Sequence, residues 1–387
     1  MPVTAHRLNY FTKSVINQMN VLAEQHGAIN LASGYPDFDP PEELLEAAER
    51  ALRSGYNQYA TPWGSPQLRQ ALSNKLTRFM GIEIDPEAHL TVTCGGTEAM
   101  LAAILAVCNP GERVIIFSPH YETYGPDMAL AGAQPIFVSL HPPEFNFDPE
   151  ELRRAFQAGA KALVLCNPSN PCGKVFSLQE LQVIADLAQE HDAFVITDEV
   201  YEHIIYEPYR HSYIASLPGM FERTLSCSSL SKTYAVTGWR LGYVVAPPQI
   251  TSAVRQLHDY LTLCAPAPLQ EAAVTALGFP DDYYRQLRVA YTRRRDLFLG
   301  SLDEAGLEYL RPQGAYFVLV DIAQLPFSDD TSFCYWLAER VGVTGVPGSY
   351  FFHELIQHYV RLNFAKRDQT LAEAGRKLGK LNDKLTG

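Results

Sequence analysis

The chain has 387 residues, of which 47% are hydrophobic and 19% charged, and this composition is typical of a globular protein with a large core rather than of a disordered one. Its net charge of −12 disfavours nucleic acid and anionic membrane surfaces as main partners, and no run is long and apolar enough to span a bilayer. The N-terminal residues lack the apolar core of a signal peptide, and the seven cysteines are scattered. We therefore expect a cytoplasmic protein with reduced cysteines.

Short apolar runs alternate with helical patterns over the middle of the chain. Seven of these runs are typical of strands: LTVTC from Leu90, RVIIFS from Arg113, PIFVSL from Pro135, KALVLC from Lys161, AFVITD from Ala193, RTLSC from Arg223 and LGYVVA from Leu241. Alternation of strands and helices favours a mostly parallel sheet that is covered by helices on both faces. The sequence therefore predicts an α/β fold built on a mostly parallel seven-stranded sheet.

The pattern changes near Asp281, where a charged helical segment begins and is followed by the apolar runs YFVLVDI and YVRLNFA. This order is typical of a smaller α+β domain. The segment before residue 43 is expected to pack with it, because PDFDPPEELLEAAERAL has the pattern of a loop followed by the start of a helix. We predict a large domain over residues 43–280 and a small domain made of residues 1–42 and 281–387.

Ligands of open parallel sheets bind beyond the carboxyl ends of the strands, so the residues that follow each run are the candidates for a site. Gly96 and Thr97 follow LTVTC and open a helix, where free N–H groups and the helix dipole favour an anion, although a plain strand–helix turn is equally compatible. Asn170 follows KALVLC in a loop with two Asn-Pro steps, NPSNPCG. Such a loop is either a rigid connector or a means of presenting an amide to a ligand.

Asp198 ends the run AFVITD, and a carboxylate at the end of a buried strand is costly unless it is paired or ligated. Tyr201 follows closely enough to contact the same ligand; the alternative is that Asp198 caps a helix. Lys232 follows RTLSC among several serines, with Arg240 in the same segment. Arginine suits phosphate because its planar fork donates hydrogen bonds in pairs, and a deprotonated lysine can form a Schiff base with an aldehyde.

These strand ends together offer an anion site, an amide, a carboxylate with a phenol, and a lysine with an arginine. Pyridoxal 5′-phosphate (PLP) requires such a set: a lysine for its aldehyde, donors for its phosphate and a carboxylate that keeps its pyridine nitrogen protonated. A metal is not expected, because the two histidines of HELIQH, from His353, are at i and i+5 and do not share a helix face. The strand ends therefore indicate a PLP site without a metal.

The motifs NPSNPCG, TDEVY and SLSKTYAVTGWRLGY occur in this order, and with them the chain resembles the class I aminotransferases, which are PLP enzymes of fold type I. The resemblance runs from about Asn30 to Ala365. The segments INLASGYPDF, NQYATPWGSPQLR and EVYEHIIY are similar to the methionine and kynurenine aminotransferase branch. One departure is Cys172, in NPCG, where the family commonly has threonine, and we expect it to be tolerated. The resemblance implies an enzyme that transfers the amino group of an amino acid to a 2-oxo acid by a ping-pong mechanism.

The resemblance also implies roles for individual residues. Lys232 would hold the cofactor and shuttle protons, and Asp198 would pair with the pyridine nitrogen. Asn170 and Tyr201 would bind the oxygen substituent of the ring, and Tyr121 would stack on the ring. The phosphate would be held by Gly96, Thr97, Ser229, Ser231 and Arg240.

Further roles that the resemblance implies concern the substrate and a second subunit. Arg361 would clamp the α-carboxylate of the substrate, with Gly34 and Asn170 beside it. Tyr59 resembles the tyrosine that reaches the phosphate of the neighbouring subunit. The resemblance therefore implies a homodimer.

The side chain of the substrate is expected to meet aromatic rings. The candidates are Phe11, Tyr35, Trp63 and Tyr121, although Phe11 and Trp63 are equally compatible with a place in the core. The stretch His258–Gln270, which is expected to contribute to the same pocket, contains no lysine or arginine, but Arg255 and Arg285 flank it. These features favour a hydrophobic, thioether or aromatic side chain, with methionine as the best candidate.

Other functions stay open at this point. A PLP enzyme of the same fold can be a carbon–sulfur β-lyase or a decarboxylase, and the fold does not separate these reactions. A lyase releases pyruvate and ammonia without an oxo-acid acceptor, which product analysis would detect. A transcription regulator of this fold is disfavoured by the acidic charge of the chain.

Overall fold

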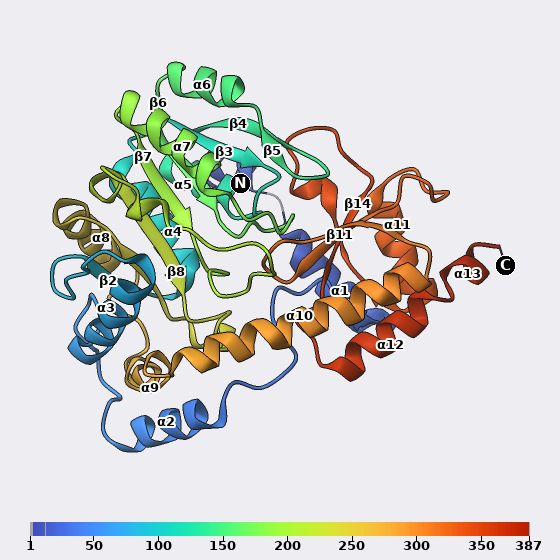
Figure 1. Cartoon of the computed structure of the whole chain (residues 1–387), viewed down its shortest axis with the longest axis horizontal. Helices are drawn as coiled ribbons and strands as arrows, with labels where there is room; N and C mark the ends of the chain where they lie inside the picture. The colour runs from blue at the N-terminus through green and yellow to red at the C-terminus, as the bar shows by residue number, and fades with distance from the viewer. Residues whose placement is uncertain (1–2, 12, 387) are drawn as a thin grey trace.

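Residues 3–11 and 13–386 are described by the structure, a computed structural model (Figure 1). Among them, eight strands form the larger sheet: β2 (Leu90–Thr93), β3 (Arg113–Ser118), β4 (Gln134–His141), β5 (Asn146–Phe147), β6 (Ala160–Cys166), β7 (Phe194–Asp198), β8 (Thr224–Ser229) and β9 (Gly242–Val245). Their order across the sheet is β2-β9-β8-β7-β6-β3-β4-β5.

The seven strands that the sequence predicts are all present in this sheet. β3, β4, β6, β7 and β8 run parallel, whereas β9 runs antiparallel to both β8 and β2. The predicted mostly parallel sheet is therefore confirmed. β5 is an additional strand of two residues that pairs antiparallel with the end of β4, and it is too short to produce an alternating pattern in the sequence.

Helices cover both faces of this sheet. The helices of this part are α3 (Pro66–Met80), α4 (Gly95–Val107), α5 (Tyr124–Ala131), α6 (Pro149–Gln157), α7 (Leu178–Glu190), α8 (Pro248–Leu261) and α9 (Ala267–Leu277). A further helix, α2 (Glu42–Arg53), packs mainly on α9. Ile115 of β3 and Leu163 of β6 join a core with α6 and α7, whereas Val114 and Val164 of the same strands join a core with α4 and α5. Successive side chains of a strand point to opposite faces, so the two cores lie on opposite sides of the sheet.

The remaining elements form a second, smaller assembly. They are α1 (Val15–His26), β1 (Ile29–Asn30), α10 (Asp281–Glu304), β10 (Glu308–Leu310), β11 (Phe317–Asp321), α11 (Asp330–Trp336), β12 (Val343–Thr344), β13 (Val346–Pro347), β14 (Tyr359–Asn363), α12 (Asp368–Leu378) and α13 (Leu381–Thr386). Short 3₁₀ turns cover His6–Tyr10, Ile214–Ser216, Phe221–Arg223, Thr237–Trp239 and Gly348–Tyr350, and a π-helical turn covers Leu337–Val341.

The smaller sheet is antiparallel, in the order β10-β11-β14-β13, and β1 pairs in parallel with β12. This pairing joins the N-terminal segment to the C-terminal part of the chain, which supports the proposed composition of the small domain. Figure 1 shows α10 running from α9 to α12, that is, from the large assembly to the small one. The domain limits at residues 43 and 281 stay a prediction, since α10 begins beside the large assembly, where Tyr284 joins its core, and then continues into the small one.

No helix in residues 3–11 and 13–386 is both long and apolar enough to cross a membrane. The same residues contain no group of three or more histidine, cysteine, aspartate or glutamate side chains placed to hold a metal ion.

Candidate active site

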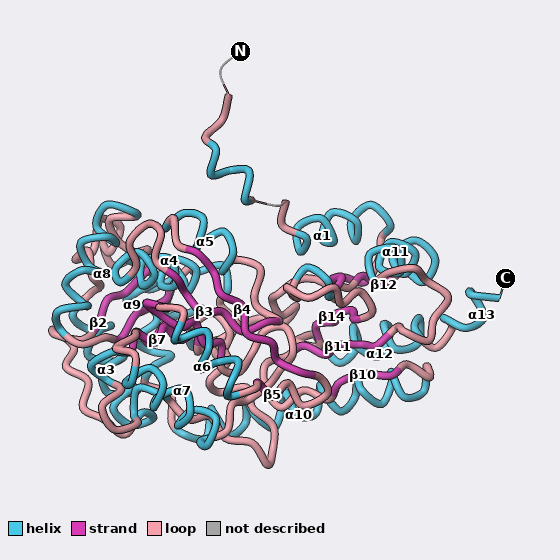
Figure 2. Tube along the Cα trace, turned by 90° about the horizontal axis from the view of Figure 1, so that it is seen from above, coloured by secondary structure: helices cyan, strands magenta, loops and turns pink. Residues whose placement is uncertain are grey.

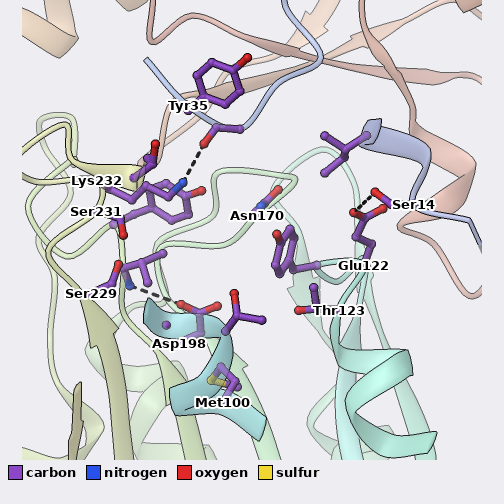
Figure 3. Close-up of a pocket in the computed structure, with 18 of the residues that line it drawn as sticks. Ser14, Tyr35, Met100, Glu122, Thr123, Asn170, Asp198, Ser229, Ser231 and Lys232 are labelled. Carbon is purple, nitrogen blue, oxygen red and sulfur yellow. Dashed lines mark hydrogen bonds between the residues drawn. The ribbon is translucent and has the colours of Figure 1, made fainter. Parts of the chain in front are cut away.

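The carboxyl ends of β6, β7 and β8 meet the N-terminus of α4 at a pocket of about 390 Å³. The following predicted site residues line it: Gly34, Tyr35, Gly96, Thr97, Tyr121, Asn170, Asp198, Tyr201, Ser229, Ser231, Lys232, Arg240 and Arg361. Figure 3 shows Lys232 and Ser231 on one side of the pocket, Glu122 and Ser14 on the other, and Asp198 below them. The polar strand ends that are dispersed in the sequence thus surround one cavity.

Lys232 lies in the segment that follows β8, and its amine points into the pocket (Figure 3). Its Nζ donates a hydrogen bond of 2.7 Å to the carbonyl of Gly34. Burial lowers the pKa of Lys232 to about 8, and the positive charges of Arg240 and Arg361 act in the same direction, whereas Asp198 opposes them. A lysine amine with such a pKa is partly neutral near pH 8 and can act as a nucleophile or a base.

A cradle for an anion lies where α4 begins. Gly95 has φ of +80°, and a Cβ atom at this position would lie 2.3 Å from Nη2 of Arg240, so glycine is needed for the guanidinium to approach the helix terminus. Arg240 Nη2 also donates to Oγ1 of Thr97, at 3.4 Å. The free N–H groups of Gly96 and Thr97 and the guanidinium therefore converge on a position that suits a phosphate.

Asp198 ends β7 and is buried at the bottom of the pocket. Its Oδ2 accepts a hydrogen bond of 2.8 Å from the hydroxyl of Tyr124, at the start of α5. In the described chain a turn, and no helix, follows Asp198, so the helix-cap alternative is wrong. Burial raises the pKa of Asp198, while the hydrogen bond from Tyr124 lowers it. Such a carboxylate gains by pairing with a buried cation.

Two phenols complete the wall around the carboxylate. Burial raises the pKa of Tyr201 well above its usual range and raises that of Tyr121 to about 12, with Glu122 adding to the effect on Tyr121. Both hydroxyls therefore keep their protons near neutral pH and can donate hydrogen bonds. The ring of Tyr201 packs edge-on against Tyr316, with 5.1 Å between the ring centroids.

Arg361 comes from β14 of the smaller sheet and is fully buried. Its Nη1 donates to Oδ1 of Asn170 at 2.8 Å, and its Nη2 donates to the carbonyl of Ala32 at 3.0 Å. The guanidinium lies 4.2 Å from the ring centroid of Phe317 and 4.8 Å from that of Phe351. Nε has no partner in the described residues, so this buried cation is left with donor capacity that a carboxylate can satisfy.

Three predicted residues lie outside the described lining of the pocket. Phe11 follows a 3₁₀ turn that packs against α5, and Figure 2 shows this turn extending away from the body of the molecule, so a role of Phe11 in the substrate pocket stays a prediction. Trp63 lines a separate hollow, where Arg255 lies 5.0 Å from its ring centroid. Tyr59 is 81% exposed. The described lining also includes no residue of the stretch 258–270 of the same chain.

The sequence prediction missed several residues of this lining. They are Ser14, Ile16, Asn17, Asn20, Met100, Glu122, Thr123, Val200 and Thr237. Four of them belong to the N-terminus of α1 or precede it, where Ser14 caps the helix by accepting from the N–H of Asn17. The cap has a sequence signal, a serine before a helical pattern, but that signal does not place α1 beside the strand ends.

The residues present fit PLP. The cradle at the start of α4, which a Cβ atom at Gly95 would fill, suits its phosphate, and the carboxylate of Asp198 suits its pyridine nitrogen. Lys232 lines the same pocket with a lowered pKa and suits its aldehyde.

Comparison with known proteins agrees with this geometry. The family model for aminotransferase class I and II matches residues 26–378. The methionine aminotransferase of Escherichia coli is 38% identical to the chain, over 95% of the chain and 96% of that protein, and human kynurenine–oxoglutarate transaminase 1 is 37% identical over 93% of each. The solved structure of N-succinyldiaminopimelate aminotransferase from Mycobacterium tuberculosis superimposes with a TM-score of 0.95, at 39% identity, over 98% of this chain and 100% of that one. The chain therefore belongs to the class I and II aminotransferases, PLP-dependent enzymes of fold type I.

Proposed function

We propose that this aminotransferase takes the amino group from an amino acid with a hydrophobic, thioether or aromatic side chain, with methionine as the best candidate, and passes it to a 2-oxo acid by a ping-pong mechanism. The observation that supports this proposal is the distribution of charge. Among the described residues that line the pocket, the basic side chains are Lys232, Arg240 and Arg361. The proposed cofactor and α-carboxylate sites use all three, so none is left for a second carboxylate of the substrate.

Each of these residues has a defined task in the proposed reaction. Bound PLP supplies an electron sink beside the α-carbon of the substrate. Asp198 would hold a proton on the ring nitrogen of the cofactor, and Arg361 would orient the substrate through paired hydrogen bonds to the α-carboxylate. Nζ of Lys232 would move the proton of the α-carbon. In the structure this amine donates a hydrogen bond to the carbonyl of Gly34.

The relatives support amino transfer but do not select the donor. The three named above act, by their names, on methionine, kynurenine and N-succinyldiaminopimelate, although their identities to this chain are nearly equal. All three are aminotransferases, which favours amino transfer over the carbon–sulfur lyase alternative. The donor must therefore be inferred from the pocket itself.

Methionine is expected to be a better donor than aspartate, with at least a tenfold higher kcat/KM. An unpaired distal carboxylate in this pocket costs more than about 1.4 kcal/mol, which corresponds to that factor. Steady-state rates for the two amino acids with one common oxo-acid acceptor measure the ratio. Aspartate rates equal to or above those of methionine would contradict the proposed donor class. Formation of pyruvate and ammonia from cysteine conjugates without an acceptor would instead indicate a lyase.

We further propose a homodimer in which Tyr59 serves the site of the other subunit. Tyr59 is 81% exposed and Tyr260 is 92% exposed in the single chain. A hydrogen bond of 2.7 Å from Nε2 of His258 to the carbonyl of Pro62 joins the segments that carry these two tyrosines. Large exposed rings on neighbouring segments are typical of a surface that another chain covers.

The variant Tyr59→Phe is expected to weaken cofactor retention about tenfold, the scale of one hydrogen bond to a charged group. The cofactor that remains after gel filtration measures retention, and sedimentation velocity should show an unchanged dimer. Tyr260→Phe is the matched control, because it removes an exposed hydroxyl of the same surface that has no proposed contact with the cofactor. A fully active monomeric wild type would rule out this proposal.

We also propose that the protein works in the cytoplasm. All seven cysteines lie in the described part of the chain, and none of them forms a disulfide there. Reduced cysteines are typical of that compartment.

A further inference from the structure

One carboxylate of the pocket has no task in the proposed reaction. Glu122 lies in the segment between β3 and α5 and lines the cavity together with Tyr121 and Thr123. Figure 3 shows it across the pocket from Lys232, on the side where Ser14 approaches. This side of the cavity is lined by four residues in or just before α1, namely Ser14, Ile16, Asn17 and Asn20.

Among the described residues, no lysine, arginine or histidine nitrogen lies within ion-pair distance of Glu122. Its charge does attract the guanidinium of Arg361, but the Nη atoms of Arg361 donate to Asn170 and to the carbonyl of Ala32. The bond that the structure gives to Glu122 is a hydrogen bond of 2.8 Å, donated by Oγ of Ser14 to Oε1. Among residues 3–11 and 13–386, no donor reaches Oε2, which can therefore accept a hydrogen bond from a substrate.

The N-terminus of α1 holds this carboxylate in place. Ser14 caps α1, since its Oγ accepts from the N–H of Asn17 at 3.3 Å, so the single hydroxyl proton is committed to Glu122. The positive end of the helix dipole favours a negative charge at this point. Glu122 thus presents a fixed negative charge to the side of the pocket that lies away from the amine of Lys232.

We infer that Glu122 determines specificity: it disfavours substrates with a distal carboxylate and favours side chains that end in a neutral hydrogen-bond donor, such as a carboxamide. The inference rests on the proposed function, because it concerns the side chain of the amino donor. A distal carboxylate would meet a like charge in a partly desolvated pocket, whereas an amide N–H can donate to Oε2. Methionine, which has neither group, should be indifferent to the charge of Glu122.

Glutamine and glutamate test this inference, because they have nearly the same shape and differ in the distal group. In Glu122→Gln, kcat/KM for glutamate relative to glutamine should rise at least tenfold, which corresponds to about 1.4 kcal/mol. The value for methionine should change by less than about threefold, because the substitution preserves the shape and the acceptor for Ser14. Glu122→Asp keeps the charge and should keep the wild-type preference. Glu46→Gln, on an exposed position of α2, controls for the change of net charge.

A binding measurement that needs no turnover separates this inference from the proposed function. Glutarate and its monoamide can be titrated calorimetrically into the holoenzyme. The wild type should bind the monoamide more tightly than glutarate. In Glu122→Gln the ratio of the two dissociation constants should shift towards glutarate by at least tenfold. Two results would overturn the inference and leave the assignment as an aminotransferase intact. The first is a binding preference that is the same in Glu122→Gln as in the wild type. The second is a loss of methionine turnover that occurs in both Glu122→Gln and Glu122→Asp. A wild type that transfers no amino group from methionine would refute the proposed donor, while the calorimetric preference would still decide the role of Glu122.

Discussion

Replacement of Lys232 by alanine is expected to reduce amino transfer by more than about 10⁴-fold, because one side chain supplies both the nucleophile for the cofactor and the base for the α-proton. The fold should survive, since the recorded polar contact of Lys232 is a single hydrogen bond to the carbonyl of Gly34. Steady-state kinetics of the purified variant and its thermal unfolding midpoint measure the two effects. A variant that keeps more than about one hundredth of the activity would contradict the assignment.

Lys366 provides the matched control for this prediction. Burial also lowers its pKa to about 8, but its Nζ donates to Oγ of Ser33 and to the carbonyl of Tyr35, and it is not among the described residues that line the pocket. Borohydride reduction of the holoenzyme should fix the cofactor to Lys232 in the wild type and in Lys366→Ala alike. A label on Lys366 would show that a lowered pKa, rather than position in the pocket, selects the lysine.

The parts of the site that the sequence predicts are those that follow strands. Asn170, Asp198 and Lys232 lie at the end of an apolar run or within a few residues of it, and the carboxyl ends of neighbouring parallel strands meet at one edge of the sheet. Local pattern and chain order therefore suffice to place them together. Arg361 is different: it comes from the smaller sheet, and its place in the site follows from the family resemblance and not from any strand-end rule.

The parts that the sequence does not predict depend on how distant elements approach one another. Glu122 and Ser14 are 108 positions apart, and their hydrogen bond exists because the residue before α1 meets the segment before α5. Aromatic residues carry even less information on position, since a ring is equally compatible with core, pocket or surface. Phe11 and Trp63 are therefore candidates for the pocket on residue type alone, and neither belongs to its described lining in the single chain. β5 was missed for a different reason, because two residues show no period.

Replacement of Asp198 by alanine is expected to lower kcat by roughly a hundredfold or more, the scale seen when a preorganised charged group is removed from a site. Asp198 is 8% exposed, and its carboxylate accepts a hydrogen bond of 2.8 Å from the hydroxyl of Tyr124. Without it, nothing among the described lining residues carries a negative charge at the end of β7, and the ring nitrogen of the cofactor would lose its proton. Single-turnover rates with a saturating donor measure the loss without interference from product release.

Two variants show whether this loss comes from the charge itself. Tyr124→Phe keeps the carboxylate and removes one hydrogen bond, so it should cost less than Asp198→Ala, on the order of tenfold at most. Asp127→Asn alters another buried carboxylate, whose pKa burial and the nearby Asp198 raise to about 7, but Asp127 is not among the described residues of the lining. Its kcat should stay within about threefold of the wild type. If Asp127→Asn lost as much activity as Asp198→Ala, the loss would come from disturbed packing around α5. A loss confined to the Asp198 variant would instead show that the required negative charge lies at the pocket surface, where a bound ring can reach it.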